Sequence, residues 1–233
     1  MSSTEPTTVS KRPNKLFYYL GGFAILMALF YVFLFSGTDY YKSKLPVLSN
    51  VQPFSFTDQN GKPVTNNSLE GKVYATEYFF TTCKGICPKM NANMYLVYDH
   101  FKGNKSFTIL SHSSMPETDS VPLLKAYEAK MKANAGINFT QWYFVTGTKD
   151  SLYKMARESY LLDNEKNNSV NIKDQFIHTQ FFALVDKQQR VRGIYDGLKK
   201  DEIDKLIENI SELMKESPDP HVFNHSTFSN NPS

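Results

Sequence analysis

The stretch that decides the fold is VYATEYFFTTCKGICPKM, residues 73–90. Its first half, Val73 to Thr81, is rich in β-branched and aromatic residues, which predicts a strand buried in a sheet. Cys83 and Cys87 follow directly, and residues 89–101 then show a helical pattern. We therefore expect the cysteines at the junction between a buried strand and a helix. If residues 83–87 form a helical turn, both sulfurs lie on one side of it.

Further strands and helices alternate around this stretch. Their order, which ends in a hairpin and a last helix, resembles a thioredoxin-like sheet and predicts an α/β fold. We expect a central mixed sheet flanked by helices, with an extra N-terminal β-hairpin. The expected strands are 54–57 (with a turn at 60–61), 107–111, 141–145, 181–186 and 190–195, and the expected helices are 121–133, 149–159 and 199–215.

A strongly apolar segment lies near the N-terminus. Residues 16–35, LFYYLGGFAILMALFYVFLF, contain no charge. Twenty helical residues span about 30 Å, the thickness of a bilayer's hydrocarbon core, whereas signal peptides have shorter apolar regions of about 7–15 residues. Three basic residues (Lys11, Arg12 and Lys15) precede the segment, and the first charge after it is Asp39. The length of the segment predicts an uncleaved single-pass anchor. The asymmetry of charge predicts that the N-terminus of this anchor lies in the cytoplasm.

The chain is expected to have five regions and a bacterial inner-membrane location, with the C-terminal domain in the periplasm. That compartment is oxidising, so a close cysteine pair can form a disulfide there. The regions are a cytoplasmic segment (1–15), a transmembrane anchor (16–35), a linker (36–52), the exported domain (53–216) and a disordered polar tail (217–233).

Composition excludes several classes of function. The 26 basic and 23 acidic residues give a net charge of +3, and no basic stripe is present, which argues against nucleic-acid binding. Two cysteines are too few for a disulfide-stapled scaffold or a four-thiolate zinc site. A structural disulfide between Cys83 and Cys87 is also disfavoured, because so small a loop constrains the unfolded chain little.

Cys83 and Cys87 are candidate metal ligands. Soft thiolates select copper(I), zinc or iron–sulfur centres, and two of them need a further donor. His178 is the preferred third ligand, because it precedes the strand expected at 181–186 on a loop that would lie near the cysteines. Two thiolates and an imidazole make a trigonal set that suits copper(I) and copper(II). His112 is a weaker candidate, for which a plain loop histidine is preferred.

Several motifs resemble the SCO/SenC family of membrane-anchored, thioredoxin-like copper chaperones for cytochrome c oxidase. The resemblance covers roughly residues 45–215 and implies that Cys83, Cys87 and His178 bind one copper ion, as Cu(I) or Cu(II). The motifs are GKVY at 71–74, FFTTC at 79–83, C-x-x-x-C-P at 83–88 and the histidine before FFALVD.

The chain departs from the family pattern at two positions. Residues 110–119, LSHSSMPETD, are similar to the family's S-x-D-P-E-x-D stretch, with Met115 where an aspartate is usual. Ile177 stands directly before His178, where the family often has an acidic residue, and Asp174 lies four residues before the histidine.

The resemblance implies two alternative roles for the same three residues. A non-enzymatic chaperone that metallates the dinuclear copper centre of oxidase subunit II is preferred. The alternative is a thiol-disulfide oxidoreductase, with Cys83 and Cys87 as its redox pair, that reduces the cysteines of that centre. Other partners would be periplasmic copper carriers or thiol reductants. Thioredoxin-type motifs separate their cysteines by two residues and not three, which disfavours the enzyme. A thiol peroxidase of the same fold class is a third hypothesis.

Overall fold

The computed structural model describes residues 15–35, 45–136, 138–163, 171–172, 175–177 and 179–216. The chain divides into two compact units, with the boundary between Lys44 and Leu45. His178 and the tail from residue 217 onward lie outside the described residues.

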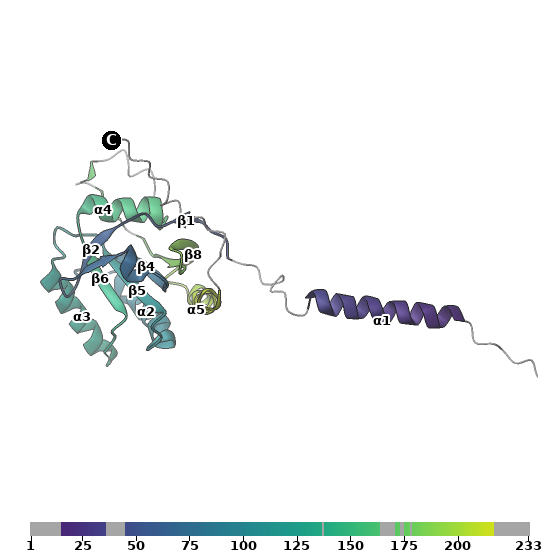
Figure 1. Cartoon of the computed structure of the whole chain (residues 1–233). Helices are drawn as coiled ribbons and strands as arrows, with labels where there is room; N and C mark the ends of the chain where they lie inside the picture. Colours follow the sequence, from purple (N-terminus) through teal and green to yellow (C-terminus); the bar gives the residue numbers. More distant parts are fainter. Residues whose placement is uncertain are drawn as a thin grey trace, which may run out of the picture. The chain divides into compact units, whose positions relative to one another are not determined.

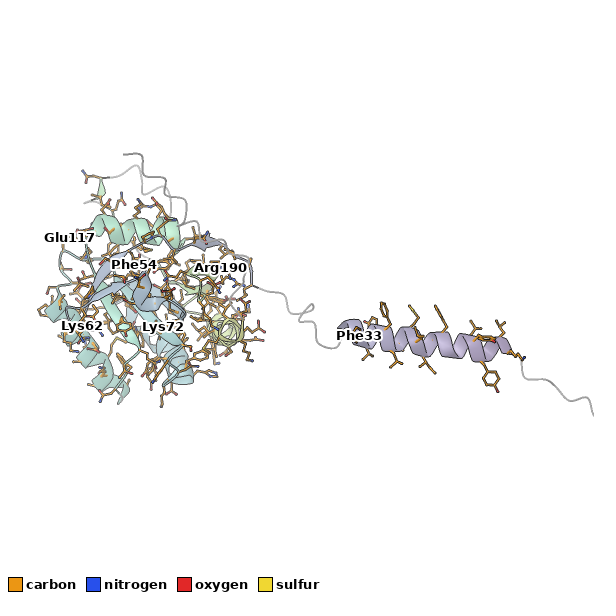
Figure 2. All side chains as sticks on the ribbon, in the orientation of Figure 1. Phe33, Phe54, Lys62, Lys72, Glu117 and Arg190 are labelled. Atoms are coloured by element: carbon orange, nitrogen blue, oxygen red, sulfur yellow. The ribbon has the colours of Figure 1, made fainter. Side chains whose placement is uncertain are left out.

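The first unit contains helix α1 (Lys15–Phe35), drawn in purple in Figure 1. The large apolar side chains that are described in this helix are exposed, and Figure 2 shows Phe33 projecting from it. Within the described residues, no helix combines the length and the apolar character needed to cross a membrane. The helix expected over residues 16–35 is present as α1, whereas its passage through a membrane stays a prediction.

The second unit is built on one mixed sheet. Among the described residues its eight strands follow the order β1-β8-β7-β4-β5-β6-β2-β3. β4 runs parallel to β5, and β5 to β6, whereas the other neighbours are antiparallel. The strands are β1 (Ser49–Asn50), β2 (Ser55–Asp58), β3 (Pro63–Thr65), β4 (Val73–Phe79), β5 (Phe107–Ser113), β6 (Trp142–Thr146), β7 (Phe181–Val185) and β8 (Arg190–Asp196).

Helices cover both faces of this sheet. Figure 1 shows α4 on one side and α2, α3 and α5 on the other. The helices are α2 (Cys87–Phe101), α3 (Val121–Ala135), α4 (Lys149–Lys154), which continues as the π-helical η3 (Met155–Ser159), α5 (Lys200–Lys215) and the short 3-10 helix η2 (Asn66–Leu69).

Strand β4 divides the core into two layers. Because side chains alternate along a strand, Val73, Ala75 and Phe79 pack under α2, α3 and α5. Tyr74 and Tyr78 point to the opposite face, where they meet α4 and η3. β4 is buried along its whole length, as its β-branched and aromatic composition predicts. Figure 2 shows the side chains that fill both layers.

The ends of α3 follow from local chemistry. Pro122 lies in the first turn, where a missing N–H costs little. Gly136 ends the helix with a φ of 68°, a left-handed conformation that glycine adopts without strain.

Two elements differ from the sequence prediction. The second unit begins at Leu45 and not at residue 53, because β1 pairs with β8 and Arg192 donates to the carbonyl of Leu45 (2.9 Å from Nε). The single helix predicted at 149–159 changes from α to π at Met155. The N-terminal hairpin, formed by β2 and β3, is confirmed.

Candidate metal centre

The two cysteines lie at the end of β4, as predicted. β4 ends at Phe79, a loop follows, and α2 begins at Cys87 itself, with Pro88 in its first turn. Only Cys87 is helical. The helical turn considered for residues 83–87 does not form, because the chain is irregular up to Ile86, the N-cap residue. Cys83 is therefore carried by the loop and Cys87 by the helix.

Asp119 fixes the start of the cysteine loop. Its Oδ1 accepts hydrogen bonds from the backbone N–H of Thr81 (3.2 Å) and from the Thr81 hydroxyl (2.6 Å). Its Oδ2 accepts from the hydroxyl of Ser113 at the end of β5 (2.6 Å). Asp119 is completely buried, so this carboxylate ties the loop to the neighbouring parallel strand. Asp119 belongs to the motif at residues 110–119, but the sequence pattern alone indicates no role for it.

Cys83 and Cys87 have unequal environments. Both are free thiols, and Cys83 is half-buried whereas Cys87 is buried. Burial, followed by the hydrogen bond with the neighbouring thiol of Cys83, raises the pKa of Cys87 to about 12, against the lowering effect of a backbone hydrogen bond at Phe80. Without metal, Cys87 is therefore protonated at neutral pH. A metal ion bound by Cys87 would have to displace that proton, and Cys83 is the more accessible of the two sulfurs.

Glu77 is a buried carboxyl group on the cysteine side of the sheet that sequence reasoning missed. Its Oε1 accepts from the hydroxyl of Ser111 (2.8 Å), which itself accepts from the indole N–H of Trp142 (2.8 Å). Its Oε2 has no hydrogen-bond partner among the described residues. Burial raises the pKa of Glu77 to about 7, against the weaker lowering effect of Ser111. The sequence did contain a signal for this buried carboxyl group: Glu77 lies on the same face of a buried strand as Val73, Ala75 and Phe79.

His178 itself lies outside the described residues, but the residues before it approach the cysteine loop. The ring of Phe176 contacts the ring of Phe80, with 5.6 Å between centroids. Phe80 lies three residues before Cys83, and Phe176 two residues before His178. The buried side chain of Ile177 anchors the same segment. The two loops that carry the predicted ligands are thus neighbours.

Tyr153 holds the segment before His178 in place. Its hydroxyl oxygen lies 2.8 Å from the carbonyl oxygen of Ser114 and 3.2 Å from that of Gln175. It also accepts a hydrogen bond from the backbone N–H of Ile177 (3.3 Å). One side chain of α4 therefore joins the segment before the histidine to the residue that follows β5. Sequence reasoning assigned no role to Tyr153.

The other candidate donors lie elsewhere. Within the described ranges no three histidine, cysteine or acidic side chains are grouped as metal ligands. Cys83 and Cys87 are the two predicted ligands that the structure describes. His112 is buried against Tyr78 on the opposite face of the sheet, and burial lowers its pKa to about 3. An approach of His112 to the site is therefore wrong, because alternation along β5 directs it away. The preferred reading of a plain loop histidine is wrong as well, because His112 is a fully buried residue of β5. Met90 and Met94, two further sulfur-bearing side chains of α2, are buried core residues.

Comparisons with known proteins agree with this architecture. The sequence pattern of the SCO1/SenC family matches residues 44–215. The SCO1 protein homolog of Bacillus subtilis (strain 168) is 34% identical over 169 residues, which are 72% of this chain and 84% of the relative.

Solved structures show the same fold. The structure that describes a disulfide switch in BsSco, a member of the Sco family of cytochrome c oxidase assembly proteins, has a TM-score of 0.60 and 32% identity, and the match covers 72% of this chain and 96% of that one. A SCO1/SenC family lipoprotein of Bacillus anthracis str. Ames matches with a TM-score of 0.60 and 28% identity, over 71% and 95% of the two chains. Copper-bound ScoI of Bradyrhizobium japonicum, 19% identical with a TM-score of 0.54, is similar in fold over 71% and 99%. The predicted thioredoxin-like fold is confirmed.

Proposed function

Because the chain belongs to the SCO1/SenC family, we propose that it is a copper chaperone in the assembly of cytochrome c oxidase. In this proposal Cys83, Cys87 and His178 bind one copper ion. The observation that carries it is the pair of free thiols at the end of β4, beside the segment that leads to His178. BsSco, which is 32% identical and is described as a member of the Sco family of cytochrome c oxidase assembly proteins, supports the same function.

The donor set fits copper as cargo. Thiolates are soft ligands that favour copper(I), and an added imidazole lets the site hold copper(II) as well. A site with two or three ligands is open to an incoming thiolate, so copper can pass to another protein by ligand exchange. Cys83 is the accessible sulfur, and it would be the first to meet a partner's ligand. Buried Cys87 would hold the metal until the exchange is complete.

We propose the dinuclear copper centre of oxidase subunit II as the recipient. The alternative function is reduction of the cysteines of that centre. Two observations support this alternative: the free thiols of this chain and the disulfide switch described for BsSco. In that reaction the Cys83 thiolate attacks a disulfide of the target, and the Cys87 thiolate then displaces the target's sulfur. The target gains two electrons and ends with two thiols. This chain ends with a Cys83–Cys87 disulfide, which a further thiol reductant would have to reduce.

We also propose that residues 16–35 anchor the protein in a bacterial inner membrane, with the C-terminal unit in the periplasm. The uncharged sequence, the helical state of α1 and the exposure of its apolar side chains support this assignment. An anchor of this kind would hold the copper site near a membrane-bound oxidase.

Deletion of the gene separates copper delivery from thiol reduction. The dinuclear copper centre of the oxidase would be measured by its visible absorption in the deletion strain, with added copper, with a membrane-permeable reductant, or with neither. Restoration by copper is the expected result and indicates delivery. Restoration by the reductant alone would replace delivery with the redox role. An intact copper centre in the untreated deletion strain would contradict both roles.

A further inference from the structure

A cleft of about 470 Å³ opens beside Cys83, between α2 and α3. Along α2 its walls include Pro88, Asn91 and Tyr95, at a spacing of three to four residues that places them on one helix face. Tyr127 and Met131 of α3 line the opposite wall. The volume lies within the range of about 300–1,000 Å³ that is usual for binding sites. Cys83, the accessible sulfur of the proposed copper site, therefore also lines a cleft whose other residues have no role in the proposed copper site.

Asn91 lines this cleft, and its buried side chain has a hydrogen-bond acceptor without a partner among the described residues. The side chain is only 7% exposed, and its Nδ2 donates to the hydroxyl of Tyr127. Its Oδ1 has no partner among the described residues. Buried polar groups in folded proteins are almost always hydrogen-bonded, so the free oxygen indicates a ligand that brings an N–H group. A polypeptide main chain presents such donors at every residue except proline.

The charge around the cleft favours an acidic ligand. Lys130 lines it, and Lys84 is adjacent to Cys83 in the sequence. Neither lysine forms an ion pair within the part of the chain that the structure describes, whereas the nearby Glu128 is paired with Lys125 and Lys132. Two uncompensated cations next to an accessible thiol attract carboxylates and thiolates.

The length of the cleft fits a short extended segment. Pro88 and Tyr95 are seven residues apart on α2, which corresponds to about 10 Å along the helix axis. An extended chain covers that distance with about three residues. Tyr95 and Met131 provide apolar surface for one side chain of such a segment.

We propose that this cleft binds a short, acidic, extended segment of the partner protein, directly beside the partner cysteine that approaches Cys83. A main-chain N–H of the segment donates to Oδ1 of Asn91, an apolar side chain packs on Tyr95 and Met131, and a carboxylate pairs with Lys130. The inference rests on the proposed function, because it takes Cys83 as the sulfur that the partner meets. It adds the residues that recognise the partner.

The test measures thiol exchange with a peptide on the full chain in mild detergent, without copper and with Cys87→Ser. The probe is the peptide Ac-Asp-Cys-Leu-Glu-Leu-amide, whose cysteine carries thionitrobenzoate in a mixed disulfide. The Cys83 thiolate attacks the peptide sulfur, a protein–peptide disulfide forms, and one thionitrobenzoate is released and measured by absorption. The small uncharged reagent 4,4′-dithiodipyridine, which releases an absorbing thiopyridone, reports the reactivity of Cys83 itself.

Two variants address the cleft. Ala92 is an exposed residue in the wall of the cleft. The Ala92→Trp variant places a large side chain in the cleft without changing a core residue. Its control is Ala126→Trp, on the exposed side of α3 and outside the cleft. Lys130→Glu reverses the charge, with exposed Lys105→Glu as its control.

We expect Ala92→Trp and Lys130→Glu each to slow exchange with the acidic peptide about tenfold, which corresponds to losing roughly one good contact. The reaction with the small reagent should change less than about twofold, and both control variants should behave like the parent. A matched peptide with lysine in place of both acidic residues should react no more slowly with Lys130→Glu than with the parent.

Equal slowing of the peptide and the small reagent would overturn the proposal, because the substitution would then act on the thiol and not on a bound segment. Unchanged peptide exchange in Ala92→Trp would also overturn it. If Ala92→Trp slowed glutathione disulfide as strongly as the peptide, the occupant would be a small thiol and not a protein segment. Copper binding is measured separately on the parent chain with both cysteines, so failure of the copper site and failure of the cleft are distinct results.

Discussion

Cys83 and Cys87 are four residues apart, yet the fold gives them different chemistry. Cys83 is in a loop and half-buried, whereas Cys87 begins α2 and is buried. Since burial raises the pKa of Cys87 to about 12, its thiolate is scarce near neutral pH. The sequence motif treats the two positions alike, and the asymmetry arises only from packing.

The asymmetry predicts selective alkylation. In the copper-free folded chain at pH 8, iodoacetamide should modify Cys83 at least about ten times faster than Cys87, because the thiolate is the reacting form. Peptide mass spectrometry after timed quenching measures both rates. In urea the two rates should become similar. Equal rates in the folded chain would contradict the environments described for the two sulfurs.

Glu77 predicts a particular dependence of stability on pH. Its pKa is raised from 4.5 to about 7 in the folded chain, so the unfolded chain loses this proton first as the pH rises. The free energy of unfolding should therefore fall between about pH 4.5 and pH 7 and then level off. Glu77→Gln carries no charge at any pH and should lack this fall. Relative to the parent it should gain up to about 3 kcal/mol between pH 4 and pH 8.

Urea unfolding followed by circular dichroism measures this difference at both pH values. The exposed residue Glu70 supplies the control, and Glu70→Gln should follow the parent at each pH. A constant difference between Glu77→Gln and the parent across the pH range would show that the Glu77 carboxyl group does not titrate as its burial implies.

At the scale of elements, α4 positions the segment that leads to His178. The Tyr153 hydroxyl contacts Ser114, Gln175 and Ile177, so Tyr153→Phe removes hydrogen bonds that join α4 to that segment. We expect copper(II) affinity to fall about tenfold, because one ligand becomes less well placed. Copper(I), which two thiolates can hold, should be affected less.

Competition with chelators for each oxidation state measures the two affinities. Tyr195→Phe is the matched control, since Tyr195 of β8 is a buried tyrosine of the other core layer, and its hydroxyl accepts a hydrogen bond from Asn209. Equal loss of copper(I) and copper(II) affinity in Tyr153→Phe would indicate general unfolding in place of a displaced histidine.

The sequence was most informative where the pattern is local. The run at β4 and the amphipathic last helix predicted their elements to within a few residues. The sequence pattern could not predict β1, because its two residues form a strand only through their pairing with β8. Nor could it show that Asp119 holds the cysteine loop, because that contact spans 38 residues. The cysteines follow from spacing, but the neighbouring position of the His178 loop depends on tertiary contacts such as Phe80 with Phe176.

At the scale of the whole molecule, the account predicts a membrane-anchored carrier. The full chain should sediment with membranes and resist extraction with carbonate, and deletion of residues 16–35 should release it. A membrane-impermeant maleimide should label Cys83 in intact spheroplasts, because the domain is expected in the periplasm. Recovery of the full chain in the soluble fraction, or labelling only after lysis, would contradict this arrangement.

The central claim is that Cys83, Cys87 and His178 bind one copper ion together, and copper(II) titration of His178→Ala tests it most directly. The parent chain and the control His100→Ala, an exposed histidine of α2, should each bind one copper(II) and show intense thiolate-to-copper absorption. His178→Ala should lose that absorption and bind copper(II) at least about a hundredfold more weakly. If His178→Ala kept both the absorption and the affinity of the parent, the three-ligand site would be wrong.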